Sequence, residues 1–293
     1  MKILFIYNPV SGKSGSRINR FGKALFELGK DDNEITVYQM KYKGDGARYL
    51  KTVDANAYDL ILGCGGDGTL HEIVDGALNV GYTHDIGYVP FGSTNDFANN
   101  LGIESNNAVD IILNHNVHLL DVGKFNNEHF NYVAAFGFFT DIPYSTPQNV
   151  KNSLGYMAYL LEGIKELTDM KSYRFRCETD SAIIEDDILV GIITNTLSVA
   201  GVKLKDHMAK LDDGMLEYVF IKYPRTLLDI QNTIFALVNN KFDNRYMYYG
   251  HSENFKISSD LMQWTLDGED GGTHDTVNII TEKQALKIIV GNE

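Results

Sequence analysis

The chain has 293 residues, and its 26 Lys and Arg against 39 Asp and Glu give a net charge of −13. This acidic excess argues against a nucleic-acid-binding protein, which needs a basic face to displace counterions from phosphates. Hydrophobic residues make up 44% and charged residues 22%, which excludes disorder, collagen and coiled coil as descriptions of the whole chain. At about 150 residues per domain, the length favours two domains.

Cysteine content and hydropathy indicate where the protein works. Cys64 and Cys177 are too few for a disulfide framework or a cysteine-based zinc site, which fits a reducing compartment. The apolar run at the N-terminus is too short for a signal peptide, and no segment has the roughly 18 apolar residues of a membrane span. We therefore expect a cytoplasmic protein that meets a membrane, if at all, from its surface.

The first 120 or so residues alternate short apolar runs with amphipathic stretches. This alternation predicts a parallel sheet with helices on both faces. The expected strands are Lys2–Tyr7, Glu34–Gln39, Asp59–Leu62 and Ile86–Val89, and the expected helices are Ser14–Gly29, Ala47–Val53 and Leu70–Leu78.

After about Asp121 the pattern changes to short runs rich in Tyr, Phe, Val and Ile between turn signals, which predicts an antiparallel β-sandwich or barrel. Helical inserts are expected near Leu154–Leu167 and Thr226–Val238. The polar stretch Gly123–Glu128 predicts the domain boundary. The expected strands are His129–Phe136, Tyr173–Cys177, Ile188–Thr196, Leu216–Ile221, Asn254–Ile257, Gln263–Leu266, Val277–Ile280 and Leu286–Val290.

Three glycine-rich loops follow predicted strands of the first half. Ligands of open α/β sheets bind at the carboxyl ends of the strands, so we expect the three loops to share one crevice. The first loop, Asn8–Gly15, offers small residues whose N–H groups can face phosphate. Position 7 is Tyr, which excludes a P-loop. A turn that begins a helix, with Ser14 or Ser16 as N-cap, explains this loop equally well.

The second loop, Gly63–Thr69, contains the pattern G-x-G-x-x-G between a strand and a helix. A dinucleotide fold is not favoured, because the pattern lies in the third strand–helix unit, includes the additional Gly66, and puts Asp67 where a pyrophosphate would approach. A carboxylate in a glycine loop fits a magnesium nucleotide, because the cation reverses the local electrostatics. A plain tight turn is the weaker alternative.

The third loop is Phe91–Phe97. Ser93 or Thr94 would serve as the cap of the next helix, which is the simple structural explanation of the loop. In a functional interpretation, the hydroxyl groups and Asp96 face the same crevice as Asp67.

Five segments, in this order, resemble the diacylglycerol kinase catalytic domain family, and the bacterial soluble lipid kinases in particular, over nearly the full chain. They are Asn8–Gly12, Gly65–Thr69, Gly92–Asp96, Lys210–Leu216 and Leu266–Glu269. NAD kinases share the second segment alone. The resemblance implies an NAD-kinase-like α/β nucleotide domain over residues 1–124, a β-sandwich lipid-substrate domain over residues 125–293, and an active site between them.

The resemblance also implies roles for single residues. Asp267 matches the general base, which accepts the proton of the lipid hydroxyl as the γ-phosphoryl group of ATP is transferred. Asp213 matches a carboxylate that holds a structural Mg²⁺ together with the carbonyls of Lys210 and Met215. Asp67 and Asp96 would lie near the catalytic Mg²⁺. The positions implied to hold ATP are Asn8, Pro9, Val10, Ser11, Gly12, Gly65, Gly66, Asp67, Gly68, Thr69, Leu70, Glu72, Ser93 and Asp96.

Some of these positions have simpler explanations or depart from the family. Asp267-Gly268 alone predicts a hairpin turn. Met40 stands where relatives often have Thr, and it would pack against the adenine or ribose. The acidic pair Glu269-Asp270 after the turn is not expected from the resemblance. We expect His71 to be a packing or capping residue and Trp264 to belong to the core.

Three segments are candidates for contact with a membrane, although solvated lysines and core packing explain each of them more simply. They are the group Lys203, Lys205, His207 and Lys210, the group Lys241, Arg245 and Tyr246–Tyr249, and the amphipathic stretch Leu154–Leu167.

The sequence thus predicts an ATP- and Mg²⁺-dependent kinase that phosphorylates a lipid hydroxyl, with diacylglycerol as the leading acceptor and phosphatidic acid as the product. A soluble-metabolite kinase like an NAD kinase and a non-catalytic nucleotide-binding regulator are the alternatives. An unpaired strand edge would allow a homodimer.

Overall fold

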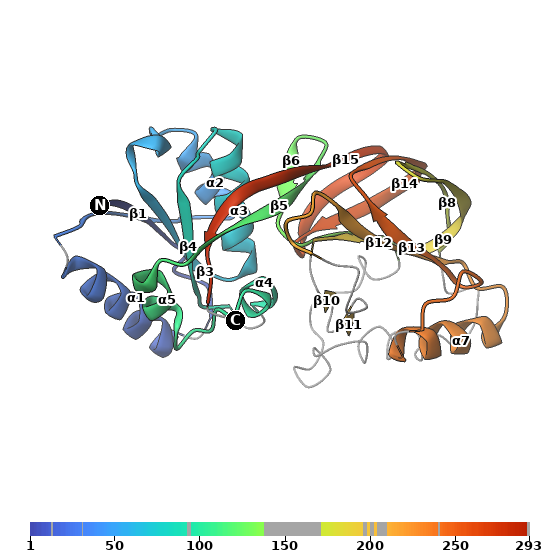
Figure 1. Ribbon diagram of the computed structural model, residues 1–293, viewed down its shortest axis with the longest axis horizontal. Coiled ribbons are helices and arrows are strands. Elements are labelled where there is room, and N and C mark those ends of the chain that lie inside the picture. Colours follow the sequence, from blue (N-terminus) through green and yellow to red (C-terminus); the bar gives the residue numbers. More distant parts are fainter. Residues whose placement is uncertain are drawn as a thin grey trace. The chain divides into compact units, whose positions relative to one another are not determined.

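A computed structural model describes residues 1–12, 14–30, 32–92, 95–137, 171–195, 198–199, 202–203, 210–239 and 241–291. The chain forms two compact units (Figure 1). The first unit contains residues 1–122, 128–131 and 283–293, and the second contains residues 123–127 and 132–282. Among the described residues, no helix is long and apolar enough to cross a membrane.

The first unit is an α/β unit built on a parallel sheet. Its strands lie in the order β2, β1, β3, β4, and all three pairings are parallel. Ile3 to Ile6 of β1 are fully buried, as expected for a strand covered on both faces. The elements are β1 (Lys2–Tyr7), α1 (Ser14–Gly29), β2 (Glu34–Gln39), α2 (Asp45–Leu50), β3 (Leu60–Gly65), α3 (Asp67–Asn79), β4 (Asp85–Pro90), α4 (Asp96–Asn100), α5 (Ala108–Asn114) and β6 (Glu128–Phe130).

The helices cover both faces of this sheet, as predicted. Contacts join α1 to α5 and α2 to α3, and the two pairs lie on opposite sides of the sheet (Figure 1). The right-handed crossover rule accounts for this, because the chain moves outward from β1 to β2 and then returns past β1 to β3 and β4. The predicted bounds of β1, α1 and β2 are confirmed, while α3 begins three residues before the predicted Leu70.

Two histidines connect α3 with the segment around β6. His71 is buried and its Nε2 lies 3.3 Å from Glu128 Oε1, which confirms the expected packing role. Asp75 accepts the backbone N–H of His129 at 2.9 Å, and its Oδ1 lies 3.0 Å from His129 Nδ1. Burial raises the pKa of the Asp75 carboxyl, but the contacts with His129 outweigh burial and hold this pKa below its usual value.

The second unit is an antiparallel β unit. Strands β9 and β14 each pair with β8 along one part and with β7 along another, so the sheet closes into a circuit β7–β9–β8–β14. Strands β12 and β13 extend the sheet from β9. The elements are β7 (Val133–Gly137), β8 (Tyr173–Thr179), β9 (Ile183–Thr194), β10 (Ser198–Val199), β11 (Val202–Lys203), β12 (Leu216–Lys222), α7 (Leu227–Val238), β13 (Met247–Ser252) and β14 (Asn254–Leu266).

Aromatic side chains form the core inside this circuit. The rings of Phe136 on β7 and Trp264 on β14 are 4.7 Å apart, and Phe136 also stacks on Phe175 of β8 at 5.2 Å. Trp264 is fully buried, which confirms its prediction as a core residue. The predicted helix Thr226–Val238 is confirmed as α7, with Thr226 as its N-cap in a capping box with Asp229.

Two strands are much longer than predicted. The expected strands Asn254–Ile257 and Gln263–Leu266 are parts of the single strand β14, which is bent by register shifts near Ser258–Met262 and Gln263–Thr265. The strand β15 (Glu269–Ile289) joins the expected Val277–Ile280 and most of Leu286–Val290 over 21 residues. Bulges let long strands bend without ending, so polar breaks in the pattern were wrongly interpreted as turns.

The boundary between the units also differs from the single division at residues 124 and 125. Gly123–Phe125 is not a turn, because β5 (Val117–Phe125) continues through it. The end of β15 belongs to the first unit, where Ile288 pairs in parallel with Ile86 of β4. A strand added to a distant sheet edge leaves no local signal in the sequence. The predicted helix Leu154–Leu167 lies outside the described residues.

Both cysteines are buried and free, Cys64 on β3 and Cys177 on β8. Burial raises the pKa of the Cys64 thiol well above its ordinary value and that of Cys177 to about 12. Because the thiolate is the reactive form, we expect neither thiol to react with a chromogenic thiol reagent in the folded protein at mildly alkaline pH. Both should react after unfolding in denaturant. Labelling of one cysteine in the native protein would show that its unit opens locally.

Candidate active site

The three glycine-rich loops lie at the carboxyl ends of β1, β3 and β4, and their backbones are in contact. A Cβ on Gly12 would lie 1.9 Å from the carbonyl oxygen of Phe91, and a Cβ on Gly92 would lie 2.8 Å from the Cα of Gly66. The N–H of Phe91 donates to the carbonyl of Gly65 at 2.6 Å. The three loops therefore lie together at one edge of the sheet, where the sequence predicted a shared crevice.

Polar side chains fasten the first loop to the second. Asn8 donates from Nδ2 to the Thr69 hydroxyl at 2.9 Å, and its Oδ1 accepts the N–H of Val10 at 3.1 Å. The N–H of Gly66 donates to the Ser11 hydroxyl at 3.3 Å. Thr69 is buried, so its hydroxyl joins the two loops from the inside. The predicted residues Asn8, Ser11, Gly66 and Thr69 thus form one cluster.

Asp67 is the first residue of α3, and Gly66 caps that helix without a side-chain hydrogen bond. The carboxylate therefore stands at the positive end of a helix dipole, next to the glycine backbone of the second loop. Tyr88, on β4, donates its hydroxyl to the Gly65 carbonyl at 3.0 Å. Burial raises the pKa of Tyr88 well above its usual value, and the nearby charge of Asp67 raises this pKa further.

Other predicted nucleotide positions have different surroundings. Leu70 is fully buried in the core. Glu72 accepts the N–H groups of Gly44 at 2.7 Å and Gly46 at 3.0 Å, so its carboxylate holds the start of α2. No local pattern predicts this role, because it depends on residues 26 to 28 positions away. Val10 is exposed at the tip of the first loop, and Met40 is buried.

The third loop is described only in part. Ser93 lies outside the described residues, and so does the side chain of Asp96, whose backbone begins α4. Asn95 adopts the left-handed conformation with φ of 50° and donates from Nδ2 to the carbonyl of Gly92 at 2.9 Å. A cavity of about 360 Å³, lined by Pro90, Asn95, Asn99 and Ser105 among others, adjoins this loop.

Asp267 lies in the second unit, in the turn that joins β14 to β15. Asp267 and Gly268 have φ of 52° and 83°, and Leu266 pairs with Glu269 across the turn. These values define a two-residue hairpin of type I′, as the Asp-Gly pair predicted. The side chain is 3% exposed, and its Oδ1 accepts the N–H groups of Tyr132 and Val133, each at 3.0 Å.

This geometry holds the carboxylate in one orientation. The backbone N–H of Asp267 also donates to the Val133 carbonyl at 2.8 Å, so the turn is tied to the start of β7 from both directions. The acidic Asp270 accepts hydrogen bonds from Gln263 and from the N–H of Gly272. The unexpected acidic residue of this loop is therefore part of the hairpin itself.

The Lys210–Met215 segment forms an exposed bend before β12. Asp213 is exposed and its Oδ1 accepts the N–H of Met215 at 3.1 Å, while Gly214 has φ of 86°. Among the described residues, no group of three or more His, Cys, Asp and Glu side chains has a metal-binding arrangement. One carboxylate beside backbone carbonyls and open solvent still fits Mg²⁺, which uses few carboxylates and keeps several waters.

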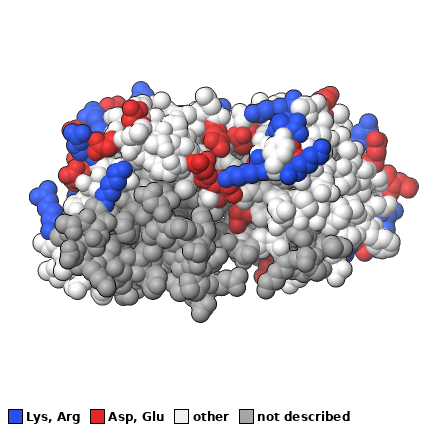
Figure 2. Space-filling model, turned by 180° about the vertical axis from the view of Figure 1, so that it is seen from behind, with Lys and Arg blue, Asp and Glu red and all other residues white. Residues whose placement is uncertain are grey.

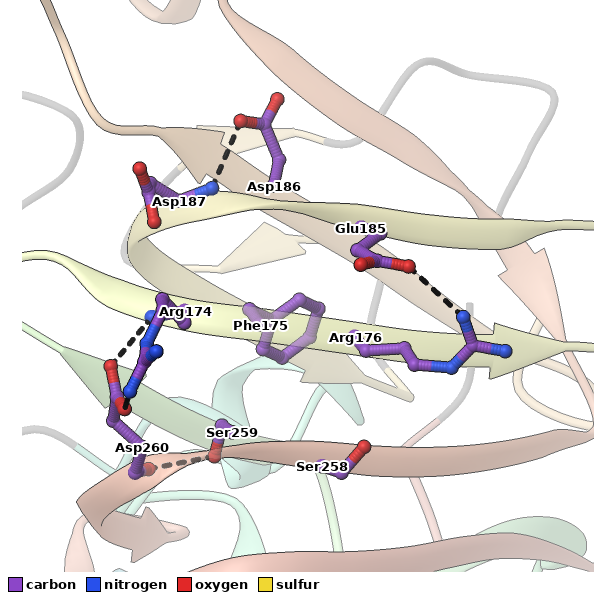
Figure 3. A pocket seen from close by; sticks show the side chains of 9 residues that line it. All are labelled: Arg174, Phe175, Arg176, Glu185, Asp186, Asp187, Ser258, Ser259 and Asp260. Atoms are coloured by element: carbon purple, nitrogen blue, oxygen red, sulfur yellow. Dashed lines mark hydrogen bonds and ion pairs between the residues drawn. The ribbon is translucent and has the colours of Figure 1, made fainter.

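A separate groove of about 500 Å³ lies on β8, β9 and β14 of the second unit (Figure 3). Four of its six charged side chains form two ion pairs: Arg174 contacts Asp260 at 3.0 Å, and Arg176 contacts Glu185 at 3.0 Å. None of the predicted site residues lines this groove.

Comparison with known proteins identifies the family. Residues 2–125 match the model of the diacylglycerol kinase catalytic domain. The chain is 30% identical over 271 residues to a diacylglycerol kinase of Bacillus subtilis, covering 91% of this chain and 89% of that protein. It is 32% identical over 272 residues to a diacylglycerol kinase of Staphylococcus epidermidis, covering 91% of this chain and 85% of that protein.

Solved structures share the fold. A diacylglycerol kinase structure from Bacillus anthracis matches with a TM-score of 0.73 at 20% identity, covering 99% of this chain and 97% of that chain. Another candidate diacylglycerol kinase of that organism matches with a TM-score of 0.81 at 22% identity and the same coverage. The sequence matches show that the chain belongs to the diacylglycerol kinase family, a family of kinases with an alcohol group as acceptor.

Proposed function

We propose that this enzyme transfers the γ-phosphoryl group of ATP to the hydroxyl of diacylglycerol, giving phosphatidic acid, with Mg²⁺ as the cofactor. The observation that carries the proposal is the joined edge of glycine loops at β1, β3 and β4, with Asp67 at the start of α3, in a chain of this family. Phosphoryl transfer needs positioning and charge neutralisation more than covalent help from the protein.

The loop edge has the right chemistry for a nucleotide phosphate. Glycines bring the loops into close contact, because a Cβ at Gly12 or Gly92 would overlap neighbouring backbone or side-chain atoms. Small residues let phosphate approach backbone N–H groups, and the N-terminus of α3, a helix of 13 residues, favours negative charge. Asp67 would hold a magnesium ion rather than the phosphate itself, and bound Mg²⁺ would neutralise charge on the β- and γ-phosphates.

Asp267 is the proposed general base. A fixed carboxylate suits proton abstraction from a hydroxyl, because general-base catalysis needs the acceptor oxygen in a defined position. The type I′ turn and the two backbone N–H donors supply this rigidity.

The test is transfer of labelled phosphate from Mg·ATP to diacylglycerol, phosphatidylglycerol, a sphingoid base and NAD, offered in parallel in mixed micelles. Label in diacylglycerol is the expected result. Label in another lipid alone would retain the assignment as a lipid kinase but with a different substrate. Label in NAD alone would overturn the lipid assignment.

Asp213 gives a separate prediction for the proposed structural Mg²⁺. If the Lys210–Met215 bend holds the ion, Mg²⁺ at about 100 times its Kd stabilises the protein by about 2.7 kcal/mol. We expect Asp213→Ala to abolish the Mg²⁺-dependent rise in Tm, and the neighbouring variant Asp212→Ala to retain it. Both carboxylates are exposed, so removal of either one should leave the metal-free Tm nearly unchanged. An equal Mg²⁺ response in both variants would remove Asp213 from the site.

A further inference from the structure

Helix α7 carries large apolar side chains on the face that points away from its own unit. Its inner face, with Ile230, Ala236 and Leu237, packs into a hydrophobic cluster with residues of β9, β12 and β13. On its outer face Leu227, Leu228 and Phe235 are 52%, 63% and 60% exposed. At about 100° per residue, Leu228 and Phe235 lie about 20° apart around the helix, and Leu227 lies at the margin of this face, about 80° to 100° from them. Figure 1 shows α7 in orange beside β12 and β13.

An exposed stripe of this kind needs an explanation. A helix that covers a core usually has a polar outer face, and one that is apolar all round is normally buried or in contact with lipid. The outer face of α7 instead has two leucines and a phenylalanine exposed by more than half. Large apolar side chains that are exposed together on one helix face indicate an interaction surface, although here the exposed Gln231 lies between Leu228 and Phe235.

The charges around α7 indicate the partner. Arg225 precedes the helix by two residues and Lys241 follows it by three, and both are exposed. Lys222 and Arg245 also flank α7, but they pair with Asp186 at 3.8 Å and with Asp243 at 2.7 Å, so Arg225 and Lys241 are the exposed cations that the proposal uses. The acidic residue of α7, Asp229, accepts the N–H groups of Arg225 and Thr226 and so belongs to the helix cap.

We propose that the outer face of α7, comprising Leu227, Leu228 and Phe235 and flanked by Arg225 and Lys241, docks on an anionic lipid bilayer. The apolar side chains enter the boundary between headgroups and acyl chains, and the two cations contact the anionic headgroups. The choice of a bilayer rests on the proposed function, because a kinase of a membrane lipid must meet its substrate there.

Charge complementarity favours the bilayer over a second copy of the chain. A two-fold contact through the same face would bring the exposed cations Arg225 and Lys241 of both copies into one interface, where like charges repel. A protein of net charge −13 is repelled by an anionic bilayer as a whole, so attraction must come from a local cluster. On the face drawn in Figure 2, acidic and basic side chains are interspersed among the described residues.

The experiment is flotation of the full chain with vesicles of phosphatidylcholine, alone or mixed with phosphatidylglycerol. One variant carries Leu228→Gln and Phe235→Gln, and another carries Arg225→Gln and Lys241→Gln. The matched apolar control is Leu261→Gln with Ile183→Gln, because these residues of the second unit are 62% and 63% exposed. The charge control is Lys256→Gln with Lys287→Gln, both exposed in the described structure.

We expect the apolar variant to bind mixed vesicles at least about tenfold more weakly. The cation variant should lose roughly fivefold per charge, on mixed vesicles only. Both control variants should bind like the wild type. Equal binding by the α7 variants and their controls would overturn the proposal. So would a change in oligomeric state, measured by sedimentation, without a change in vesicle binding.

A second assay separates this proposal from the proposed function. Turnover of a short-chain, water-soluble diacylglycerol does not require docking, so the α7 variants should phosphorylate it at the wild-type rate. No turnover of any acceptor by the wild type would refute the kinase assignment whatever the vesicles show. If an α7 variant phosphorylates the soluble acceptor normally and still binds vesicles, docking through α7 is refuted and the kinase assignment stands.

Discussion

Replacement of Asp267 by Asn is expected to lower turnover by about 100- to 10,000-fold, the usual contribution of a general base, while ATP binding and thermal stability stay close to wild type. Asn retains an oxygen that can accept the N–H groups of Tyr132 and Val133. It also tolerates the positive φ of 52° at this position, and Asn-Gly is the preferred pair of a type I′ turn. The substitution therefore removes the negative charge and preserves the turn.

The measurements are the kcat of lipid phosphorylation, ATP affinity by calorimetry and Tm. Asp270→Asn, in the same hairpin but exposed, is the matched control and should keep nearly full activity. Asp267→Ala should lose stability in addition to activity, because two partly buried N–H groups lose their acceptor. Retained turnover in Asp267→Asn would show that Asp267 positions the turn and is not the base.

Local signals predicted much of the first unit and of the loop cluster. Continuous apolar runs and helical spacing gave β1, α1 and β2 with their observed bounds, because each pattern extends through its whole element. The contact between Gly12 and Phe91 could be expected from the topology, because the carboxyl ends of parallel strands lie at the same edge of a sheet. The hairpin at Asp267-Gly268 followed from turn chemistry.

Features that depend on distant partners were not predicted. The carboxylate of Glu72 holds the backbone before and within α2, and no pattern near position 72 indicates those partners. The last residues of β15 join the sheet of the first unit, although the sequence around them predicts another strand of the second unit. The exposed stripe of α7 was also missed, because apolar residues on both faces of a helix resemble a buried helix in sequence.

The first glycine loop offers the second large effect. Gly12 has φ of 69°, and an added Cβ would lie 1.9 Å from the Phe91 carbonyl oxygen. We expect Gly12→Ala to destabilise the protein by about 3 kcal/mol or more, because backbone strain of about 1 kcal/mol adds to a collision with main chain that cannot move cheaply. The first and third loops must separate, so the KM for ATP should also rise at least about tenfold if they bind the nucleotide.

Two matched glycines separate the causes of this effect. Gly44 has φ of 84° with open space around its Cβ position, so Gly44→Ala should show the cost of strain alone, about 1 kcal/mol. Gly22, in the middle of α1, has neither positive φ nor a neighbour within 4 Å, and Gly22→Ala should stabilise the helix by roughly 0.5–1 kcal/mol. Denaturant unfolding and ATP titration of the three variants give the comparison.

Equal losses of unfolding free energy for Gly12→Ala and Gly44→Ala would mean that the Phe91 backbone moves away from the added Cβ at little cost. A loss of stability in Gly12→Ala without a change in the KM for ATP would place the nucleotide away from the first loop.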